Sequence, residues 1–336
     1  MRVQVAPRWC HCSDRSDCSA CQIRFEMIRL LLLAAIVVFL SACSPEIDDL
    51  PALEPDTSLR SESEIRVVDY LGRDVVLERS ASRIVALSPH IVENLYSAGA
   101  GERIVAAVAY SDYPEPAKSI YQLGGVGSVS LESIIAMIPD LVVVWGSGDQ
   151  NSSQLVRRLE KLAIPVYVDE PRKLSDVARS IADFGKLAGI EREAQTASKA
   201  YLAALDGVRL KHKNLSPIKV FYQIWDDPLQ TLNGEHMVSS MMTLCGAANV
   251  FADAPLLAPQ VSVEAVIKRN PDIIFASANE ELGEPWLNEW RSWDSLKAVK
   301  HDALFRLNPD WMSRPTVRLL HGLRDMCLKI SSARES

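Results

Sequence analysis

The sequence predicts an α/β protein built from two similar lobes, and three observations support this prediction. Short apolar strands alternate with helical segments, which is typical of parallel sheets covered by helices on both faces. One segment occurs twice, in residues 129–145 and 261–277. A long helical stretch without proline lies between the two copies. We therefore expect central parallel sheets in both lobes, one long rigid α-helix joining them, and a ligand cleft between the lobes.

The first lobe is predicted to occupy residues 65–189. It begins with a hairpin in residues 69–77, which turns at Leu71-Gly72-Arg73. A later segment with helical spacing ends at Gly189. Between them, continuous apolar runs predict strands in residues 83–87, 103–110, 141–144 and 164–168.

The repeated segment has the pattern of a helix, a turn and a strand. The copies share six of 17 positions, and most other positions exchange one apolar residue for another. Each copy has a serine suited to cap a helix, a glutamate in the first turn, and a Pro-Asp pair before an apolar strand. A duplicated unit of this kind implies two lobes of similar build.

A linking helix is predicted over residues 190–214, and the second lobe over residues 215–330. The helical pattern of residues 191–213 would extend about 34 Å, at about 1.5 Å per residue. That length is sufficient to cross from one lobe to the other as a stiff connection.

Residues 1–42 are predicted to be a leader for export. The apolar run of 11 residues at positions 30–40 is shorter than the roughly 20 residues that a membrane span needs, and it fits a secretory signal peptide. It ends in Leu-Ser-Ala-Cys43, which resembles the bacterial lipobox and implies a lipid on Cys43. Residues 43–64 are rich in proline, serine and acid, which predicts a solvated tether. The alternative is a buried helix followed by a chance cysteine.

The first 26 residues contain four cysteines, at positions 10, 12, 18 and 21. One interpretation is a start codon assigned too early, because Met27 begins a short signal peptide by itself. The other is a small zinc knuckle, since thiolate pairs bind Zn²⁺.

Composition limits the function of the remaining chain. It is about 290 residues long from Cys43, which is enough for two domains. The net charge of −7 argues against a nucleic-acid partner. Beyond Cys43, only Cys245 and Cys327 remain, either as a disulfide or as two separate buried thiols. A disulfide across this separation would contribute about 4 kcal/mol to stability.

Aromatic and polar residues follow several predicted strands, where ligands bind in α/β sheets. Such residues suit a large, flat, amphipathic ligand, which is held by stacking and by polar groups at its rim. Trp286, Trp290 and Trp293 lie at helical spacing and are predicted to pack in the core instead. The candidate ligand-binding residues are Pro89, His90, Tyr113, Trp145, Trp225, Asp310, Trp311 and Arg314.

Several of these segments resemble the cobalamin-binding proteins of ABC importers. These proteins belong to a wider helical-backbone family that also carries ferric siderophores and haem. The resemblance covers about residues 65–330, and it rests on SPHIVEN from Ser88, YSDYP from Tyr110, PDLVVVW from Pro139, Cys245-Gly246, PQVSVE from Pro259 and NPDWMSRPT from Asn308.

The resemblance implies roles for individual residues. Tyr113 and Trp145 match aromatics that pack on the corrinoid, and the Asp310-Trp311 stretch matches a ligand-contacting loop. Cys245 and Cys327 match a disulfide. Glu132 and Glu264, one in each copy of the repeat, match carboxylates that dock onto arginines of a two-fold symmetric permease; the alternative is that both only interact with a helix dipole.

The sequence departs from the family at two positions. One pocket aromatic is replaced in Gly125-Val126 and another in Leu257-Ala258, which puts the ligand in doubt more than the fold. The expected function is a monomeric, lipid-anchored periplasmic protein, with the outer membrane favoured, that delivers cobalamin or a related corrinoid to a permease. No resident cofactor or metal is expected.

Three alternatives remain open. A ferric siderophore or haem would suit the same fold. A zinc or manganese binder would gather histidines, but the chain has six in all and no histidine-rich loop. A hydrolytic enzyme would need a nucleophile–base pair, and the sequence has neither a G-x-S-x-G motif nor a phosphate-binding loop.

Overall fold

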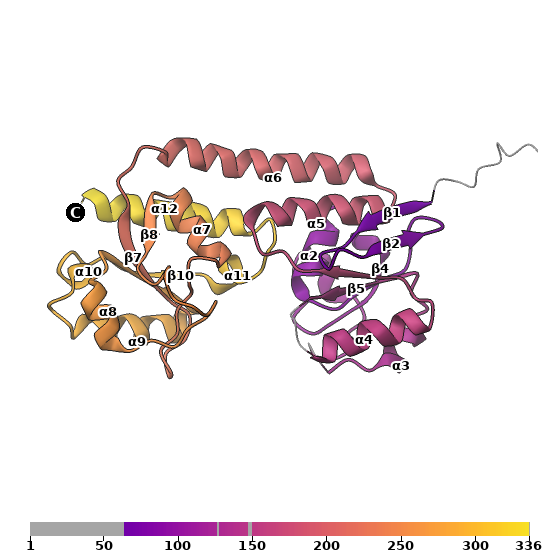
Figure 1. Ribbon diagram of the computed structural model, residues 1–336, viewed down its shortest axis with the longest axis horizontal. Helices are drawn as coiled ribbons and strands as arrows, with labels where there is room; N and C mark the ends of the chain where they lie inside the picture. Colours follow the sequence, from indigo (N-terminus) through magenta and orange to yellow (C-terminus); the bar gives the residue numbers. More distant parts are fainter. Residues whose placement is uncertain (1–63, 126–127, 147–149, 336) are drawn as a thin grey trace, which may run out of the picture. The chain divides into compact units, whose positions relative to one another are not determined.

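The computed structural model describes residues 64–125, 128–146 and 150–335 (Figure 1). The predicted leader, the predicted lipidation site Cys43, all but the last residue of the tether and the hypothetical zinc knuckle lie outside these ranges. Their interpretation stays as the sequence leaves it.

The first lobe contains a four-stranded parallel sheet with the strand order β4-β3-β5-β6. A separate antiparallel hairpin pairs β1 (Ile65–Val68) with β2 (Asp74–Leu77), and Gly72 takes a φ of 76° at its turn. Asp69 holds that turn, because its carboxylate accepts the backbone N–H groups of Leu71 and Arg73. The strands of the parallel sheet are β3 (Ile84–Ala86), β4 (Ile104–Ala107), β5 (Leu141–Trp145) and β6 (Val166–Asp169).

The second lobe contains another four-stranded parallel sheet, with the order β10-β9-β7-β8. Numbered within each lobe, both sheets have the order second, first, third, fourth. The predicted α/β class and duplicated architecture are therefore confirmed. The strands are β7 (Ile218–Gln223), β8 (Ala247–Asn249), β9 (Ile273–Ser277) and β10 (Leu304–Leu307).

Helices alternate with these strands. The first lobe has short 3-10 turns η1 (Gly101–Arg103) and η2 (Glu115–Ser119) and the helices α2 (Pro89–Ser97), α3 (Leu131–Ala136), α4 (Gln150–Lys161) and α5 (Leu174–Leu187). The second has α7 (Met237–Leu244), α8 (Val263–Arg269), α9 (Glu280–Arg291), α10 (Lys297–Lys300), α11 (Pro309–Met312) and α12 (Leu319–Glu335). The last helix continues five residues beyond the boundary predicted for this lobe.

The repeated segment forms α3 with β5 in one lobe and α8 with β9 in the other. Ser130 and Ser262 cap the two helices, and each hydroxyl accepts a backbone N–H three residues later. Each Pro-Asp pair has a structural use as well. Asp140 accepts the N–H of Arg83, and Asp272 accepts the N–H of Lys219, so each aspartate fixes the start of the neighbouring strand.

The linking helix α6 (Glu191–His212) lies within the predicted range, and Figure 1 shows it alongside α5 and α12. Tyr201 and Leu205 of α6 are buried. They belong to one continuous apolar cluster that also contains Ile84 of the first sheet and Val220 of the second. Because this cluster is shared, bending at α6 would disturb a packed core.

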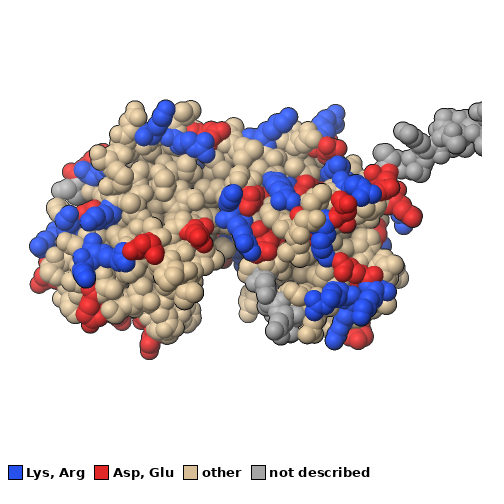
Figure 2. All heavy atoms as spheres, viewed as in Figure 1, with Lys and Arg blue, Asp and Glu red and all other residues tan. Residues whose placement is uncertain are grey.

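A disulfide joins Cys245, at the end of α7, to Cys327 of α12, with the two Cα atoms 4.9 Å apart. This pairing is the one that the resemblance implies. Charged side chains of both signs are interspersed over much of the face shown in Figure 2.

Candidate functional site

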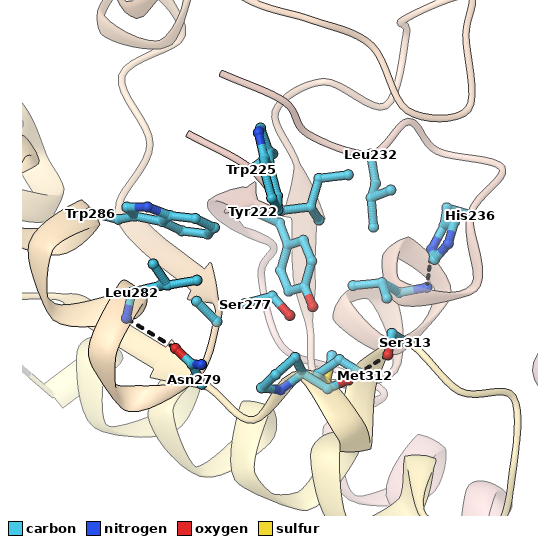
Figure 3. Close-up of a pocket in the computed structure, with 14 residues that line it drawn as sticks. Tyr222, Trp225, Leu232, His236, Ser277, Asn279, Leu282, Trp286, Met312 and Ser313 are labelled. Carbon is cyan, nitrogen blue, oxygen red and sulfur yellow. Dashed lines mark hydrogen bonds between the residues drawn. The ribbon is translucent and has the colours of Figure 1, made fainter. Parts of the chain in front are cut away.

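A cavity of about 440 Å³ lies where β7 and β9 end (Figure 3). Tyr222 and Trp225 come from the end of β7, and Ser277 ends β9. Leu282 and Trp286 come from α9, while Met312 and Ser313 come from the segment after β10. The cavity is thus at the carboxyl ends of parallel strands, where the sequence predicts ligand-binding residues.

Two tryptophans form one wall of this cavity. Trp225 is 52% exposed, and its indole N–H donates to the carbonyl of Asp227. Trp286 lies 6.4 Å away between ring centroids, at an interplanar angle of 67°. Trp286 packs in the core as predicted, at 6% exposed, and also lines the cavity, whereas Trp293 is 40% exposed. Trp290, one turn later, is buried and donates to the side chain of Gln223.

A few polar groups interrupt the apolar lining. Burial raises the pKa of Tyr222, and a hydrogen bond with Ser277 opposes this shift. His236 caps α7, because its Nδ1 accepts the N–H of Val238 at 3.2 Å. Burial lowers the pKa of His236 to about 4, so the ring is neutral at pH 7. An apolar cavity with a few fixed polar groups is the usual form of a small-molecule site.

A buried ion cluster connects the two lobes. Glu93 of α2 is 2% exposed, and its carboxylate accepts bonds from Arg318 at 2.6 and 2.9 Å and from Arg314 at 3.0 Å. The amide of Asn94 also donates to the carbonyl of Pro315, at 3.0 Å. The segment that carries Arg314 begins with Pro309 and Met312, which line the cavity. The cavity and the ion cluster therefore share one short stretch of chain.

Arg314 gathers three carboxylates. Besides Glu93, it contacts Asp112 at 3.2 Å and Asp310 at 3.7 Å, and both of these are exposed. Burial opposes its charge, but the hydrogen bond to Glu93 and the neighbouring carboxylates raise its pKa overall. The guanidinium of Arg318 lies 4.2 Å from the ring centre of Tyr113. Three of the predicted residues, Tyr113, Asp310 and Arg314, thus meet in one cluster.

His90 does not present a free ring. It is 4% exposed, with one nitrogen 2.7 Å from the Ser88 hydroxyl and the other 3.2 Å from the Asp169 carboxylate. Ser180 completes the chain, donating to Asp169 at 2.5 Å. Both ring nitrogens of His90 therefore already have partners, and its direct contact with a ligand stays a prediction. Ser88, His90 and Asp169 follow one another as in a catalytic triad, and Ser88 is itself buried, at 3% exposed.

The remaining predicted residues have other neighbours. Trp145 is 42% exposed, and its ring meets the edge of His90, with centroids 5.7 Å apart. It also borders a smaller cavity of about 280 Å³ beside Arg73. Pro89 is half-buried at the start of α2. Trp311 packs against His321, with centroids 5.7 Å apart.

The two predicted docking residues have similar surroundings. Glu132 and Glu264 are both exposed in the first turns of α3 and α8. Hydrogen bonds to its own backbone N–H and to Ser262 lower the pKa of Glu264. Each therefore presents a carboxylate to solvent at the corresponding place of its lobe.

The sequence did not single out Glu93, Arg318 or Trp286 as site residues. Glu93 lies within the segment SPHIVEN that contributes to the family resemblance, but no role for it follows from the sequence. Across the described residues, no group of three or more histidine, cysteine or acidic side chains is placed to hold a metal ion. None of the described helices is long and apolar enough to cross a membrane.

Known proteins share this architecture and much of its sequence pattern. Residues 84–311 match the family described as periplasmic binding protein. The vitamin B12-binding protein of Vibrio campbellii is 32% identical over 255 residues, which covers 76% of this chain and 91% of that protein. The vitamin B12-binding protein of Vibrio cholerae is 32% identical over 256 residues, again covering 76% of this chain and 91% of the relative.

Solved structures agree. The crystal structure of the periplasmic vitamin B12-binding protein of Vibrio cholerae matches with a TM-score of 0.69, covering 76% of this chain and 99% of the other. A periplasmic heme-binding protein from Roseiflexus, 20% identical, matches with a TM-score of 0.66 over 76% of this chain and 99% of that one, which shows a shared fold alone. The chain belongs to the periplasmic binding protein family.

Proposed function

We propose that this protein captures cobalamin or a related corrinoid and delivers it to an ABC permease, as a binding protein and not as an enzyme. The observation that carries the proposal is the match to vitamin B12-binding proteins along most of the chain, at 32% identity. The site adds chemical support. A corrinoid is a flat macrocycle edged by amides, which suits exposed aromatic rings together with carboxylates and a guanidinium.

The exposed rings available for such a ligand are Tyr113, Trp145 and Trp225. Asp112, Asp310 and Arg314 provide acceptors and donors for amide groups. Where the family has an aromatic, Leu257 is 53% exposed. A leucine offers apolar contact without stacking, so we expect Trp225 and Trp286 to contribute the aromatic surface in this lobe.

Calorimetric titration tests the ligand directly. The chain from residue 46 onward is titrated with cyanocobalamin, and with a ferric siderophore and haem as controls. We expect one-to-one binding of cyanocobalamin and none of the controls. Binding of haem or the siderophore without cyanocobalamin would transfer the proposal to that chelate and leave the fold unaffected.

Delivery is proposed to depend on Glu132 and Glu264 as matched contacts for cationic groups on the permease. The double variant Glu132→Arg, Glu264→Arg reverses both charges on exposed positions. We expect it to bind cyanocobalamin normally and to lose salt-sensitive binding to the permease. Unchanged transport by this variant would exclude the docking role.

We also propose that the protein is a monomer held in the periplasm by a lipid on Cys43, with the outer membrane favoured. The support is the lipobox-like sequence that ends at Cys43. The variant Cys43→Ala is expected to leave the membrane fraction for the soluble periplasmic fraction. A membrane-bound Cys43→Ala protein would rule out this anchor.

A further inference from the structure

The ends of the two duplicated helices differ in a way that their pseudo-symmetry does not explain. We call residues 135–138 the α3 tip and residues 267–270 the α8 tip; the two occupy equivalent positions of the repeat. The α3 tip is Ile-Ala-Met-Ile, whereas the α8 tip is Ile-Lys-Arg-Asn. One tip is thus wholly apolar, and the other carries two basic residues.

The α3 tip is also exposed. Ile138 is 75% exposed and Ile135 is 40% exposed. Ile135 lies one helical turn after Glu132, so both face the same side of α3. The α8 tip makes more contacts within the protein. Arg269 donates a hydrogen bond to the carbonyl of Val250 and contacts Asp253 at 2.9 Å.

Ile138 has a backbone conformation that suits it poorly. Its φ is 48°, in the left-handed region, which is an outlier for a β-branched residue. The equivalent Asn270 has a φ of 47°, and asparagine tolerates this region well. Arg83 holds the turn by donating to the carbonyls of Ile138 at 3.0 Å and Met137 at 2.6 Å.

The Ile138 side chain therefore adds strain to the fold and buries little surface in return. Strained and exposed residues of this kind are concentrated where a partner binds. The neighbouring Glu132, with its twin at Glu264, is the feature that would select a two-fold symmetric partner carrying a cation at each matching position. An apolar depression beside one such cation would accept Ile138.

We propose that the α3 tip is an apolar contact for the permease, centred on Ile138 and adjacent to Glu132, with no counterpart at the α8 tip. The proposal rests on the proposed function, since the partner is the permease. It makes docking unequal at the two lobes: the second lobe relies on Glu264, while the first lobe adds to Glu132 an apolar contact, at the α3 tip, that salt does not screen.

Three single variants of the full chain test the proposal: Ile138→Asn, Ile138→Leu and the matched control Asn270→Ile. Binding to the cognate permease–ATPase complex in nanodiscs is measured by interferometry, beside melting temperature and cyanocobalamin affinity. Ile138→Asn is expected to raise the melting temperature by about 2 °C, because it relieves strain, and to weaken permease binding about tenfold.

The other two variants separate strain from apolar contact. Ile138→Leu keeps an apolar side chain without β-branching, and should keep permease affinity. Asn270→Ile should lower the melting temperature and leave permease affinity unchanged. All three should bind cyanocobalamin like the wild type.

Full permease affinity in Ile138→Asn would overturn the proposal. If Glu132→Arg, Glu264→Arg still lost permease binding in the same assay, the proposed docking function would stand without it. Wild-type protein that failed to bind the permease at all would overturn both.

Discussion

The carboxyl ends of the two sheets carry different side chains, although the sheets share one strand order. In the first lobe, this edge holds the exposed Trp145 beside a buried polar chain, in which His90 bridges Ser88 and Asp169. In the second lobe, the same edge holds an apolar cavity bounded by Trp225 and Trp286. The two lobes therefore share a scaffold, while the side chains at the carboxyl ends of their strands differ.

This difference suits a ligand with unlike faces or edges. The apolar cavity gains free energy from burying a hydrocarbon or aromatic surface, whereas the region of Arg314 offers directed hydrogen bonds. Glu93 connects the two regions, since it binds Arg314 and Arg318 from the other lobe.

Removing the charge of Glu93 should have the largest effect. In Glu93→Gln, the buried guanidinium of Arg318 loses its carboxylate partner and Arg314 loses one of three, and breaking a buried pair in this way costs about 4 kcal/mol. We expect the free energy of unfolding to fall by that amount in denaturant titration.

The matched control for Glu93 is Asp112→Asn, which removes an exposed carboxylate from the same arginine, Arg314. Its expected effect on unfolding is about 0.5 kcal/mol or less. Equal effects of the two variants would mean that burial does not distinguish the contacts, and that Glu93 is not the connection described above.

Acid should destabilise the second lobe through protonation of His236. Its folded pKa of about 4 lies below the ordinary value of 6.5, so the unfolded chain binds more protons between these pH values. The stabilisation by neutral His236 is complete above pH 6.5 and is lost as the pH falls toward 4. Allowing for its partly exposed ring, the loss is about 2 kcal/mol.

The variant His236→Asn isolates this effect, because asparagine also caps helices but does not titrate. Denaturant unfolding of both proteins at pH 7 and pH 4.5 gives the comparison. We expect the stability of the wild type to fall further than that of the variant. Parallel losses would show that protonation of His236 is not responsible.

Much of the fold could be predicted from the sequence. The strands were apparent as apolar runs, and the repeat at 129–145 and 261–277 predicted the duplicated lobes. The cavity was located only in part: Trp225 follows a strand and was identified, while Trp286 was assigned to packing with Trp290. Helical spacing shows that two residues share a face, but not that one end of this face opens into a cavity.

Other features depend on contacts that no local pattern contains. Glu93 lies within an ordinary helix, and its partner Arg318 is 225 residues away in the sequence. His90 lies at a strand end as predicted, yet both of its ring nitrogens are within hydrogen-bonding distance of Ser88 and Asp169. The repeat aligns Ile138 with Asn270 but does not reveal that both take a left-handed backbone conformation.

The central claim is that both lobes contact one ligand, and a calorimetric double-mutant cycle with cyanocobalamin tests it most directly. Trp145 and Trp225 are each about half exposed and lie in different lobes, so replacing either by alanine should leave stability unchanged. We expect one-to-one binding, with affinity weakened about tenfold in each single variant and further in the double variant. Wild-type affinity in either Trp145→Ala or Trp225→Ala would contradict the claim that the ligand contacts that tryptophan's lobe.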